Sequence, residues 1–286
     1  MRGGEVVHER YEWGHTRTHL QYSWSMAKSI THALVGLLVK HGLIDLDAPA
    51  AVAEWANDSR REITVSHLLA MRSGLAFGEE YFDGSSDVVD MLFGDGRHDM
   101  AAYAAAKQLV HEPGSVFHYS SGTTNIICRL IQDALRAAGE QRDMLRFMRD
   151  ELFEPAGMRS ATPRFDTVGT FVGSSWCLCS PRDFARFGQL YLDDGVVEGR
   201  RVLPEGWAAH AAMPTTAEVD EGYGSHWWLP GTSIDAPESM FYAGGFEGQR
   251  IMVVPARDLV IVRCGRTSVD EMPDVDRRLY ELAAAL

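Results

Sequence analysis

Apolar residues recur at three- and four-residue intervals along much of the chain, which is the spacing of one face of an α-helix. In residues 25–41 this face is formed by Ile30, Leu34 and Leu37, and Gly42 is typical of the residue that follows a helix. The pattern therefore predicts a helix over residues 25–41. The same spacing predicts further helices at residues 64–71, 122–138, 142–153, 181–194 and 204–213, and a last one from about 275 to 286.

Toward the end of the chain the pattern changes to short apolar runs rich in β-branched and aromatic residues. Turn sequences separate these runs, and strands joined by short links pair antiparallel. Residues 5–11 also alternate enough to form a strand, whereas the Gly-, Asp- and Ser-rich residues 75–97 indicate an irregular surface loop. The predicted strands of the C-terminal part lie at residues 223–229, 239–244, 249–254 and 259–264.

Strands at both ends of the sequence and helices between them predict an α+β fold. The simplest arrangement is an antiparallel sheet flanked by helices, with a mostly helical lobe inserted into it. We expect a single domain over residues 1–286, which is long enough to bury a sizeable core. Its sheet-containing lobe would comprise residues of about 1–45 and 165–286, and its helical lobe residues of about 46–164.

The charge narrows the class of partner. The chain has 40 acidic and 27 basic residues and a formal net charge of -13, and a negative surface repels nucleic acid and anionic membranes. The N-terminus lacks the apolar core of a signal peptide, and the longest strongly apolar stretch, residues 33–39, is too short to span a bilayer. We therefore expect a cytoplasmic protein that binds neither nucleic acid nor membrane, while its oligomeric state, monomer or dimer, is left open.

Metal-ligating residues form no recognisable motif. Cys177 and Cys179 make a C-x-C pair and His15 and His19 stand four residues apart, but neither pair has a third ligand nearby in the sequence. The zinc-peptidase, P-loop and dinucleotide-binding motifs are absent, as is the G-x-S-x-G motif of α/β-hydrolases. We therefore expect neither a metal nor a cofactor.

The positive chemical signal is the sequence Ser25-Met26-Ala27-Lys28 at the start of the first predicted helix. Residues three apart share one face of a helix, so the Lys28 amine can reach the Ser25 hydroxyl. A serine becomes a nucleophile when a neighbouring base takes its proton, and lysine can do so only if burial or a nearby cation lowers its pKa. The apolar residues after Lys28 favour burial, whereas a serine that merely caps the helix is the simpler interpretation of Ser25 alone.

Two later segments add to this signal. Tyr119 and Ser121 lie on a predicted loop just before a helix, where Tyr119 could shuttle a proton and could ionise more easily beside a cationic lysine. Gly244 and Gly245 end a predicted strand, so a substrate could approach their backbone N–H groups closely. Taken alone, these segments would be interpreted as a capped helix start and a hairpin turn.

Together these segments follow the order found in the serine β-lactamase-like hydrolases, which the chain resembles over nearly its whole length. The family includes class C β-lactamases, D-Ala-D-Ala peptidases, esterases and 6-aminohexanoate-dimer hydrolases, and the chain looks closest to the last two groups. The strings that carry the resemblance are SWSMAKSITHALVG, HLLAMRSGL, PGSVFHYSSGTTN, LFEPAGM, SPRDFARFGQLYLDDG and AGGFEGQRIMVVPARDLVIVRCG.

The resemblance implies a role for each motif residue. Ser25 would be the nucleophile that becomes acylated, Lys28 its proton partner and Tyr119 the general base and acid. Ser121 would support the Lys28 network. The oxyanion hole and the backbone along the substrate would be formed by Ser25, Phe246, Gly245 and Gly244. Pocket residues suggested by their loop positions and the resemblance are Tyr81, Phe82 and Trp176.

Two departures from the family pattern shape the functional expectation. Ala243 occupies the position where the family usually has a cation that holds the carboxylate of penicillin-type substrates. The chain also begins almost at its first hairpin, so we expect an N-terminally shortened sheet. The preferred function is hydrolysis of esters or small amides through an acyl-enzyme on Ser25. The alternatives are a D-Ala-D-Ala peptidase or β-lactamase, and a catalytically silent family member that acts as a binding module.

Overall fold

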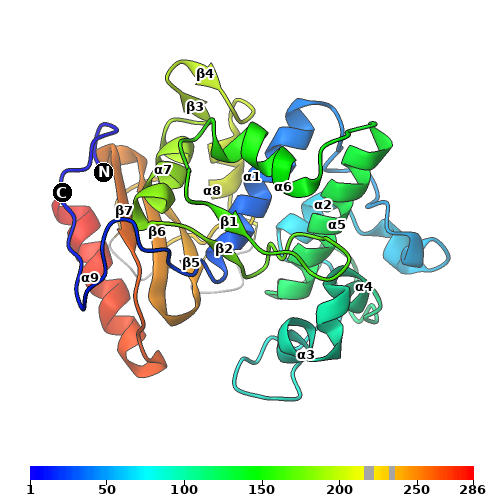
Figure 1. Ribbon diagram of the computed structural model, residues 1–286. Helices are drawn as coiled ribbons and strands as arrows, with labels where there is room; N and C mark the ends of the chain where they lie inside the picture. The colour runs from blue at the N-terminus through cyan, green and yellow to red at the C-terminus, as the bar shows by residue number, and fades with distance from the viewer. Residues whose placement is uncertain (216–221, 232–235) are drawn as a thin grey trace.

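The computed structural model describes residues 1–215, 222–231 and 236–286. Figure 1 shows two regions side by side, with helix α1 (Met26–Lys40) between them. One region contains the three-stranded sheet, the C-terminal helix and both ends of the chain, and the other is built from the helices that follow α1 in the sequence. This mixture of helices and antiparallel strands confirms the predicted α+β class.

The sheet consists of β5 (Phe241–Gly245), β6 (Gln249–Val254) and β7 (Leu259–Arg263), paired antiparallel in that order. Side chains alternate between its two faces, as the pleat of a strand requires. Ile251 and Val253 of β6 face the main core with α1 and α7 (Pro181–Leu192), whereas Met252 and Val254 face α9 (Met272–Ala285). The prediction of β6 is therefore confirmed at both ends, and β5 and β7 agree to within two residues.

Helix α1 is buried on all sides from Met26 to Leu38, because the sheet, α5 (Ser121–Ala137) and α8 (Trp207–Ala212) pack around it. Gly36 is required by this packing, since a Cβ atom there would lie 2.5 Å from Nε1 of Trp207. The predicted helix at residues 25–41 is confirmed, with Ser25 as the residue that precedes its first turn.

Helices of the second region begin directly after residues that cap them. Thr64 and Ser120 precede helices and accept hydrogen bonds from backbone N–H groups of the first turn. The predicted helix at residues 142–153 is observed as α6, which continues into a π-helical segment at residues 149–153. Besides α5, the helices of this region are α2 (Val65–Leu69), α3 (Asp87–Phe93), α4 (Met100–Ala105) and α6 (Met144–Met148), with 3-10 turns at Ala53–Trp55, Ser59–Glu62 and Asp95–His98.

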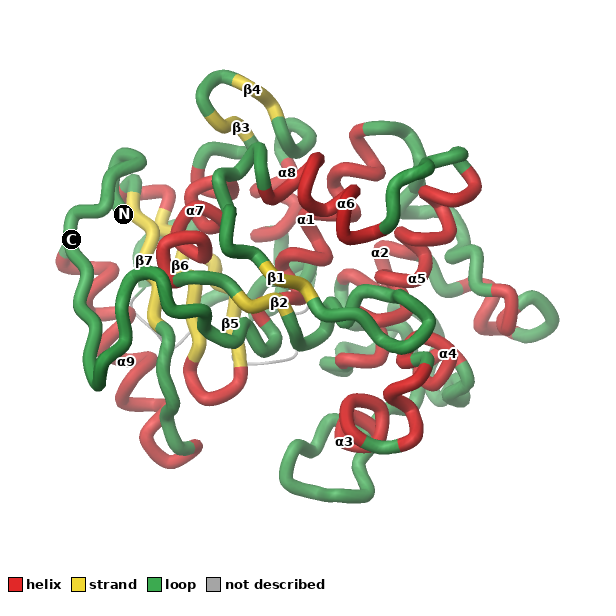
Figure 2. Tube along the Cα trace, in the orientation of Figure 1, coloured by secondary structure: helices red, strands yellow, loops and turns green. Residues whose placement is uncertain are grey.

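Three local predictions are wrong, and for one of them Figure 2 shows helix α3 within a segment predicted as a loop. Residues 5–11 form no strand, because they lie along the surface without a neighbouring strand, and Arg2 instead makes a bridge to Leu259 at the edge of β7. The predicted loop at residues 75–97 contains α3. Residues 223–229 make isolated bridges but no strand. Two short hairpins were not predicted, β1 (Thr162–Pro163) with β2 (Cys177–Leu178) and β3 (Val196–Val197) with β4 (Arg200–Arg201).

Among the described residues, no helix combines the length and the apolar character needed to cross a membrane.

Candidate active site

Ser25 lies at the point where the chain turns sharply into α1. The preceding residue, Trp24, has a positive φ of 44°, a conformation that L-residues adopt rarely. The Ser25 side chain makes no capping hydrogen bond to the helix, although it occupies the capping position. Its hydroxyl instead contacts the Lys28 amine, which speaks against the interpretation of Ser25 as a simple helix cap.

Lys28 is almost completely buried, with 2% of its surface exposed. Its Nζ atom lies 3.0 Å from Ser25 Oγ, 3.1 Å from Ser121 Oγ and 2.9 Å from the carbonyl oxygen of Ser174. Burial lowers the pKa of Lys28 to about 8, against the opposing effect of the Glu79 carboxylate. An appreciable fraction of the amine is therefore neutral near neutral pH and can accept a proton.

Tyr119 stands beside this pair, with Lys28 Nζ 4.8 Å from the centre of its ring. The ring stacks on Trp228 at 5.2 Å between centroids, which fixes its orientation. Burial raises the pKa of Tyr119, and the nearby Glu79 carboxylate raises it further. A hydrogen bond with the Ser25 side chain lowers this pKa, but by less. The expectation that Tyr119 ionises more easily is therefore wrong, because burial raises its pKa and outweighs the lowering effects of Ser25 and Arg250.

Glu79 is the residue of this site that the sequence did not reveal. Its Oε1 atom accepts a hydrogen bond of 2.6 Å from the Ser121 hydroxyl, and its Oε2 atom one of 2.8 Å from the Ser121 backbone N–H. The Tyr81 hydroxyl donates to Oε1 at 2.7 Å. Glu79 lies in the segment predicted as an irregular surface loop, where a glutamate carries no signal that separates it from solvated neighbours.

The end of β5 packs against the turn that precedes Ser25. A Cβ atom at Gly245 would lie 2.4 Å from the backbone oxygen of Ser23, so only glycine allows the strand this close. The ring of Phe246 contacts Trp24 at 5.5 Å between centroids. The structure thus brings Gly245 and the ring of Phe246 beside the turn that precedes α1.

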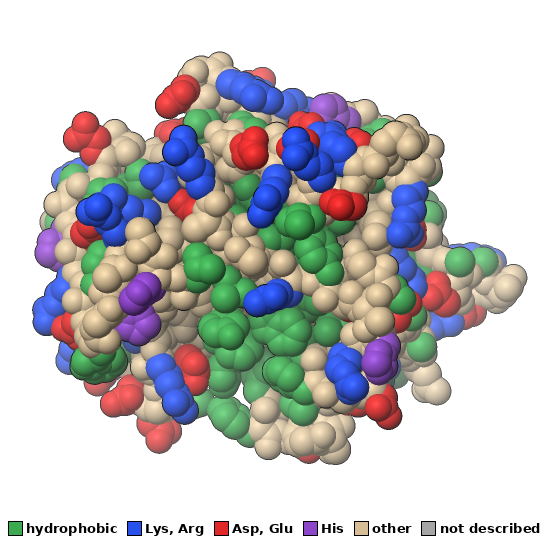
Figure 3. All heavy atoms as spheres, in the orientation of Figure 1, with side chains coloured by type: hydrophobic (Ala, Val, Ile, Leu, Met, Phe, Trp, Pro, Cys, Tyr) green, Lys and Arg blue, Asp and Glu red, His purple; other side chains and the backbone are tan. Residues whose placement is uncertain are grey.

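The three aromatic residues suggested for a pocket do not form one group. Tyr81 and Phe82 contact Phe246, at 5.4 and 6.0 Å between ring centroids. Trp176 instead contacts Phe93 of α3 at 5.7 Å. Figure 3 shows hydrophobic side chains gathered across the middle and lower part of the face drawn, between the positions of β5 and α3 in Figure 1.

The pairs considered as metal ligands remain pairs. Cys177 and Cys179 have their sulfur atoms 3.9 Å apart, and the exposed rings of His15 and His19 contact each other at 5.6 Å. Among the described residues, no group of three or more His, Cys, Asp or Glu side chains is arranged to hold a metal ion.

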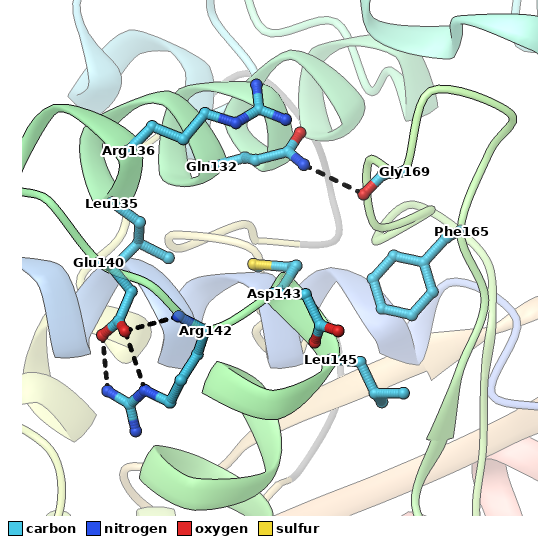
Figure 4. A pocket seen from close by; sticks show the side chains of 10 residues that line it. Gln132, Leu135, Arg136, Glu140, Arg142, Asp143, Leu145, Phe165 and Gly169 are labelled. Atoms are coloured by element: carbon cyan, nitrogen blue, oxygen red, sulfur yellow. Dashed lines mark hydrogen bonds and ion pairs between the residues drawn. The ribbon is translucent and has the colours of Figure 1, made fainter.

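A separate depression of about 430 Å³ lies where the end of α5 meets the start of α6. Figure 4 shows the ion pair between Glu140 and Arg142 in its wall, with Phe165 on the opposite side. Its lining includes neither Ser25 nor Lys28, and the Arg142 guanidinium in it is already paired with three carboxylates.

Known proteins similar to this chain over most of its length carry the names of hydrolases. A 6-aminohexanoate-dimer hydrolase of Paenarthrobacter ureafaciens is 27% identical over 97% of this chain and 73% of its own length. A Bacillus anthracis protein provisionally named a 6-aminohexanoate-dimer hydrolase has a similar structure, with a TM-score of 0.85, 22% identity and coverage of 100% of this chain and 78% of that one. The crystal structure of a family VIII carboxylesterase matches with a TM-score of 0.69 and 16% identity, over 93% of this chain and 84% of that one.

The family itself is defined by a match over the full sequence. Residues 1–286 match the family described as β-lactamase. The predicted resemblance, and with it the class of enzyme, is therefore confirmed. The chain belongs to the β-lactamase family of serine hydrolases.

Proposed function

We propose that this protein hydrolyses esters or small amides through an acyl-enzyme on Ser25, with Lys28 and Tyr119 as its proton-transfer groups. The observation that carries the proposal is the 3.0 Å contact between the Ser25 hydroxyl and the buried Lys28 amine. A base next to a serine hydroxyl is the arrangement that activates a serine nucleophile. Burial keeps part of this amine neutral, which a base requires.

In the acylation step the neutral Lys28 amine takes the Ser25 proton while Ser25 Oγ bonds to the carbonyl carbon of the substrate. The bond to the alcohol or amine leaving group then breaks, and the leaving group receives a proton through Tyr119, which is replenished from the Lys28 ammonium. Tyr119 suits the role of an acid in its protonated form, because burial raises its pKa. In deacylation the proton transfers run in reverse. Water attacks the acyl carbon and gives a proton to Tyr119 and Lys28, and Ser25 Oγ takes back a proton as the carboxylic acid leaves.

The negative charge that forms on the carbonyl oxygen needs hydrogen-bond donors. The first turn of α1 begins at Met26, so the positive end of the helix dipole lies next to Ser25. We assign the oxyanion hole to the backbone N–H groups of Ser25 and Phe246, supported by the close approach of Gly245 to Ser23. Gly244 and Gly245 would leave room for the substrate beside the strand.

The environment of Ala243 favours esters and simple amides over penicillins. Its side chain is 1% exposed and belongs to the main hydrophobic core, so this position offers no cation to a substrate carboxylate. We propose that Tyr81 and Phe82, which contact Phe246 near Ser25, line the side of the site that receives an apolar group. Trp176 contacts Phe93 rather than Phe246, so we do not include it in this side of the site.

The proposed partner is thus a small ester or amide. The cysteines of the described residues are free thiols, which agrees with the proposed reducing, cytoplasmic location.

Intact-mass measurement after treatment with a fluorophosphonate tests the proposal. We expect one adduct per chain, placed on Ser25 by peptide mapping, and loss of both the adduct and p-nitrophenyl ester hydrolysis in Ser25→Ala. Absence of an adduct on Ser25, together with unchanged hydrolysis in Ser25→Ala, would refute it.

Two parallel measurements separate the alternatives. Covalent labelling by a fluorescent penicillin would favour a β-lactamase or D-Ala-D-Ala peptidase, and no labelling and no hydrolysis of any ester or dimer amide would favour a binding module. A series of p-nitrophenyl esters of different acyl lengths, alongside one linear dimer amide, would then define the substrate class.

A further inference from the structure

We propose that Glu79 is a positioning residue that directs the lone pair of the Lys28 amine at the Ser25 hydroxyl, acting through the hydroxyl of Ser121. This inference rests on the proposed function, because it explains how Lys28 is oriented as the base for Ser25. Glu79 makes no hydrogen bond to Ser25 or Lys28, and the Ser121 hydroxyl hydrogen-bonds both Glu79 and Lys28.

The direction of each hydrogen bond follows from the donors and acceptors present. A carboxylate can only accept, so the 2.6 Å contact between Glu79 Oε1 and Ser121 Oγ uses the proton of the Ser121 hydroxyl. Ser121 Oγ can then only accept from Lys28 Nζ, which lies 3.1 Å away. The second carboxylate oxygen accepts from the Ser121 backbone N–H at 2.8 Å, so Ser121 is held at two points.

The donors and acceptors around a neutral Lys28 amine also determine its orientation. Such an amine has two N–H donors and one lone pair, and two neighbouring atoms, Ser121 Oγ and the Ser174 carbonyl oxygen, can only accept. These acceptors use both donors. The remaining neighbour is Ser25 Oγ at 3.0 Å, so the lone pair points at the group whose proton it must take.

Without Glu79, the Ser121 hydroxyl could donate its proton to the Lys28 lone pair and compete with Ser25. The side chain of Ser121 is 1% exposed, so solvent offers its hydroxyl little alternative. The Glu79 carboxylate therefore fixes the direction of the hydrogen bond between Ser121 and Lys28, with Lys28 as the donor. In this direction the lone pair of Lys28 stays available for the Ser25 proton.

The charge of Glu79 gives this role a measurable signature. The titratable and charged groups around Lys28 are Glu79, Cys128 and His226, with Tyr119 over its amine. Among these, Glu79 is the largest influence that raises the pKa of Lys28 against the effect of burial. Removing its charge should therefore lower the pKa of Lys28 further.

Glu79 is not needed merely to hold its own loop. The Gly78 backbone N–H donates to Asp87 Oδ2 at 2.8 Å, and the Glu80 backbone N–H donates to Ser86 Oγ at 3.0 Å. These contacts anchor the loop to the start of α3 independently of Ser121. Glu80, the exposed neighbour of Glu79, contacts Ser86 rather than Ser121 and so provides a matched control.

The experiment compares the pH dependence of kcat/KM for a p-nitrophenyl ester in wild type, Glu79→Gln, Glu79→Asp and Glu80→Gln. We expect Glu79→Gln to lower the plateau value on the order of tenfold to a hundredfold and to move the rising limb to lower pH by on the order of one unit. Glu80→Gln should match wild type, and Glu79→Asp should restore the position of the limb. If the rising limb of the Glu79→Gln profile lies at the same pH as in wild type, the inference is overturned, whatever the plateau value of kcat/KM.

A second variant keeps the test informative if Glu79→Gln folds poorly. In Ser121→Ala the relay is already broken, so adding Glu79→Gln should lower the plateau rate no further. Full additivity of the two losses would overturn the relay. Fluorophosphonate labelling of wild-type Ser25 distinguishes the two levels of failure: a labelled Ser25 with an unmoved limb refutes only the role of Glu79, whereas an unlabelled Ser25 refutes the proposed function itself.

Discussion

Helix α1 carries two buried titratable residues one turn apart, Lys28 and His32, and their surroundings differ in a way that separates chemistry from structure. His32 is fully buried and contacts the Tyr191 hydroxyl at 2.7 Å and His210 Nδ1 at 3.0 Å, with Trp207 stacked on its ring at 4.6 Å. Of its hydrogen-bond partners, Tyr191 is buried and His210 is partly exposed. Lys28, by contrast, contacts the hydroxyl of Ser25, which is partly exposed and which a base can turn into a nucleophile.

The electrostatic surroundings of His32 and Lys28 also differ. Burial lowers the pKa of His32 well below its ordinary value, and the neighbouring histidines His210 and His226 lower it further. At Lys28 the Glu79 carboxylate opposes burial, and the pKa stays at about 8. Burial of an ionisable group is therefore not itself a sign of catalysis. The group must also keep a pKa near the working pH and face an atom that a substrate can reach.

Replacing Lys28 should have the largest effect on activity. In Lys28→Met the base for Ser25 is lost while a side chain of similar length fills the buried space, so kcat/KM for a p-nitrophenyl ester should fall about 10²- to 10⁴-fold. The buried carbonyl group of Ser174 loses its donor, so the free energy of unfolding should also fall, by about 1–3 kcal/mol. Steady-state kinetics and thermal unfolding of the purified variant measure both quantities. Retention of wild-type kcat/KM would contradict the assignment of Lys28.

Two matched hydroxyl deletions sharpen the comparison. Tyr119→Phe should lower kcat/KM on the order of 10²-fold with little change in unfolding temperature, because its hydroxyl serves proton transfer. Tyr191→Phe should leave kcat/KM near wild type but lower the free energy of unfolding by about 1–3 kcal/mol, since it leaves His32 Nδ1 buried without its partner. Urea unfolding and ester kinetics of both variants test this. If Tyr119→Phe lost stability and Tyr191→Phe lost activity, the roles assigned to the surroundings of Lys28 and His32 would be wrong.

Wild-type activity should follow the pKa of Lys28. Because only the neutral amine accepts the Ser25 proton, kcat/KM should fall about tenfold per pH unit below pH 8 and level off above it. A pH profile of a neutral p-nitrophenyl ester, corrected for its spontaneous hydrolysis, measures this limb. A profile that is flat between pH 6 and 9 would mean that Lys28 does not titrate in the rate-determining step.

How much of this was accessible from the sequence differs from residue to residue. Ser25 and Lys28 could be predicted because their spacing and the apolar residues around them follow from local helix geometry. β6 could be predicted because its apolar run is bounded by clear turns. Glu79 could not, because its importance depends on Ser121, 42 positions away in the sequence. The raised pKa of Tyr119 depends likewise on burial created by distant segments, including Trp228.

The wrong predictions have a related cause. Residues 5–11 have an alternating pattern, but a strand requires a neighbour with free backbone groups, and this segment runs along the surface. The segment 75–97 was predicted as a loop from its Gly, Asp and Ser content, yet Val88, Met91 and Leu92 within it bury one face of α3. Tertiary contacts decided both cases against the local pattern.

The smallest expected effect is a loss of stability in acid, which comes from buried histidines such as His32. The pKa values of His32 and His226 are lowered in the folded protein, His226 to about 3, whereas both are near 6.5 when unfolded. The unfolded chain thus binds more protons below pH 6.5. The stability from these neutral histidines is complete above pH 6.5 and is lost as the pH falls below it, by up to about 1.4 kcal/mol per pH unit for each.

This loss can be assigned to His32 by comparing the urea unfolding of wild type and His32→Gln between pH 6.5 and 5. Other groups titrate in this range, so the absolute slope of stability against pH is not diagnostic, but the difference between the two slopes is. The slope of His32→Gln should be shallower by about 1.4 kcal/mol per pH unit. Equal slopes would mean that His32 is charged in the folded protein, and the contrast with Lys28 would then no longer hold.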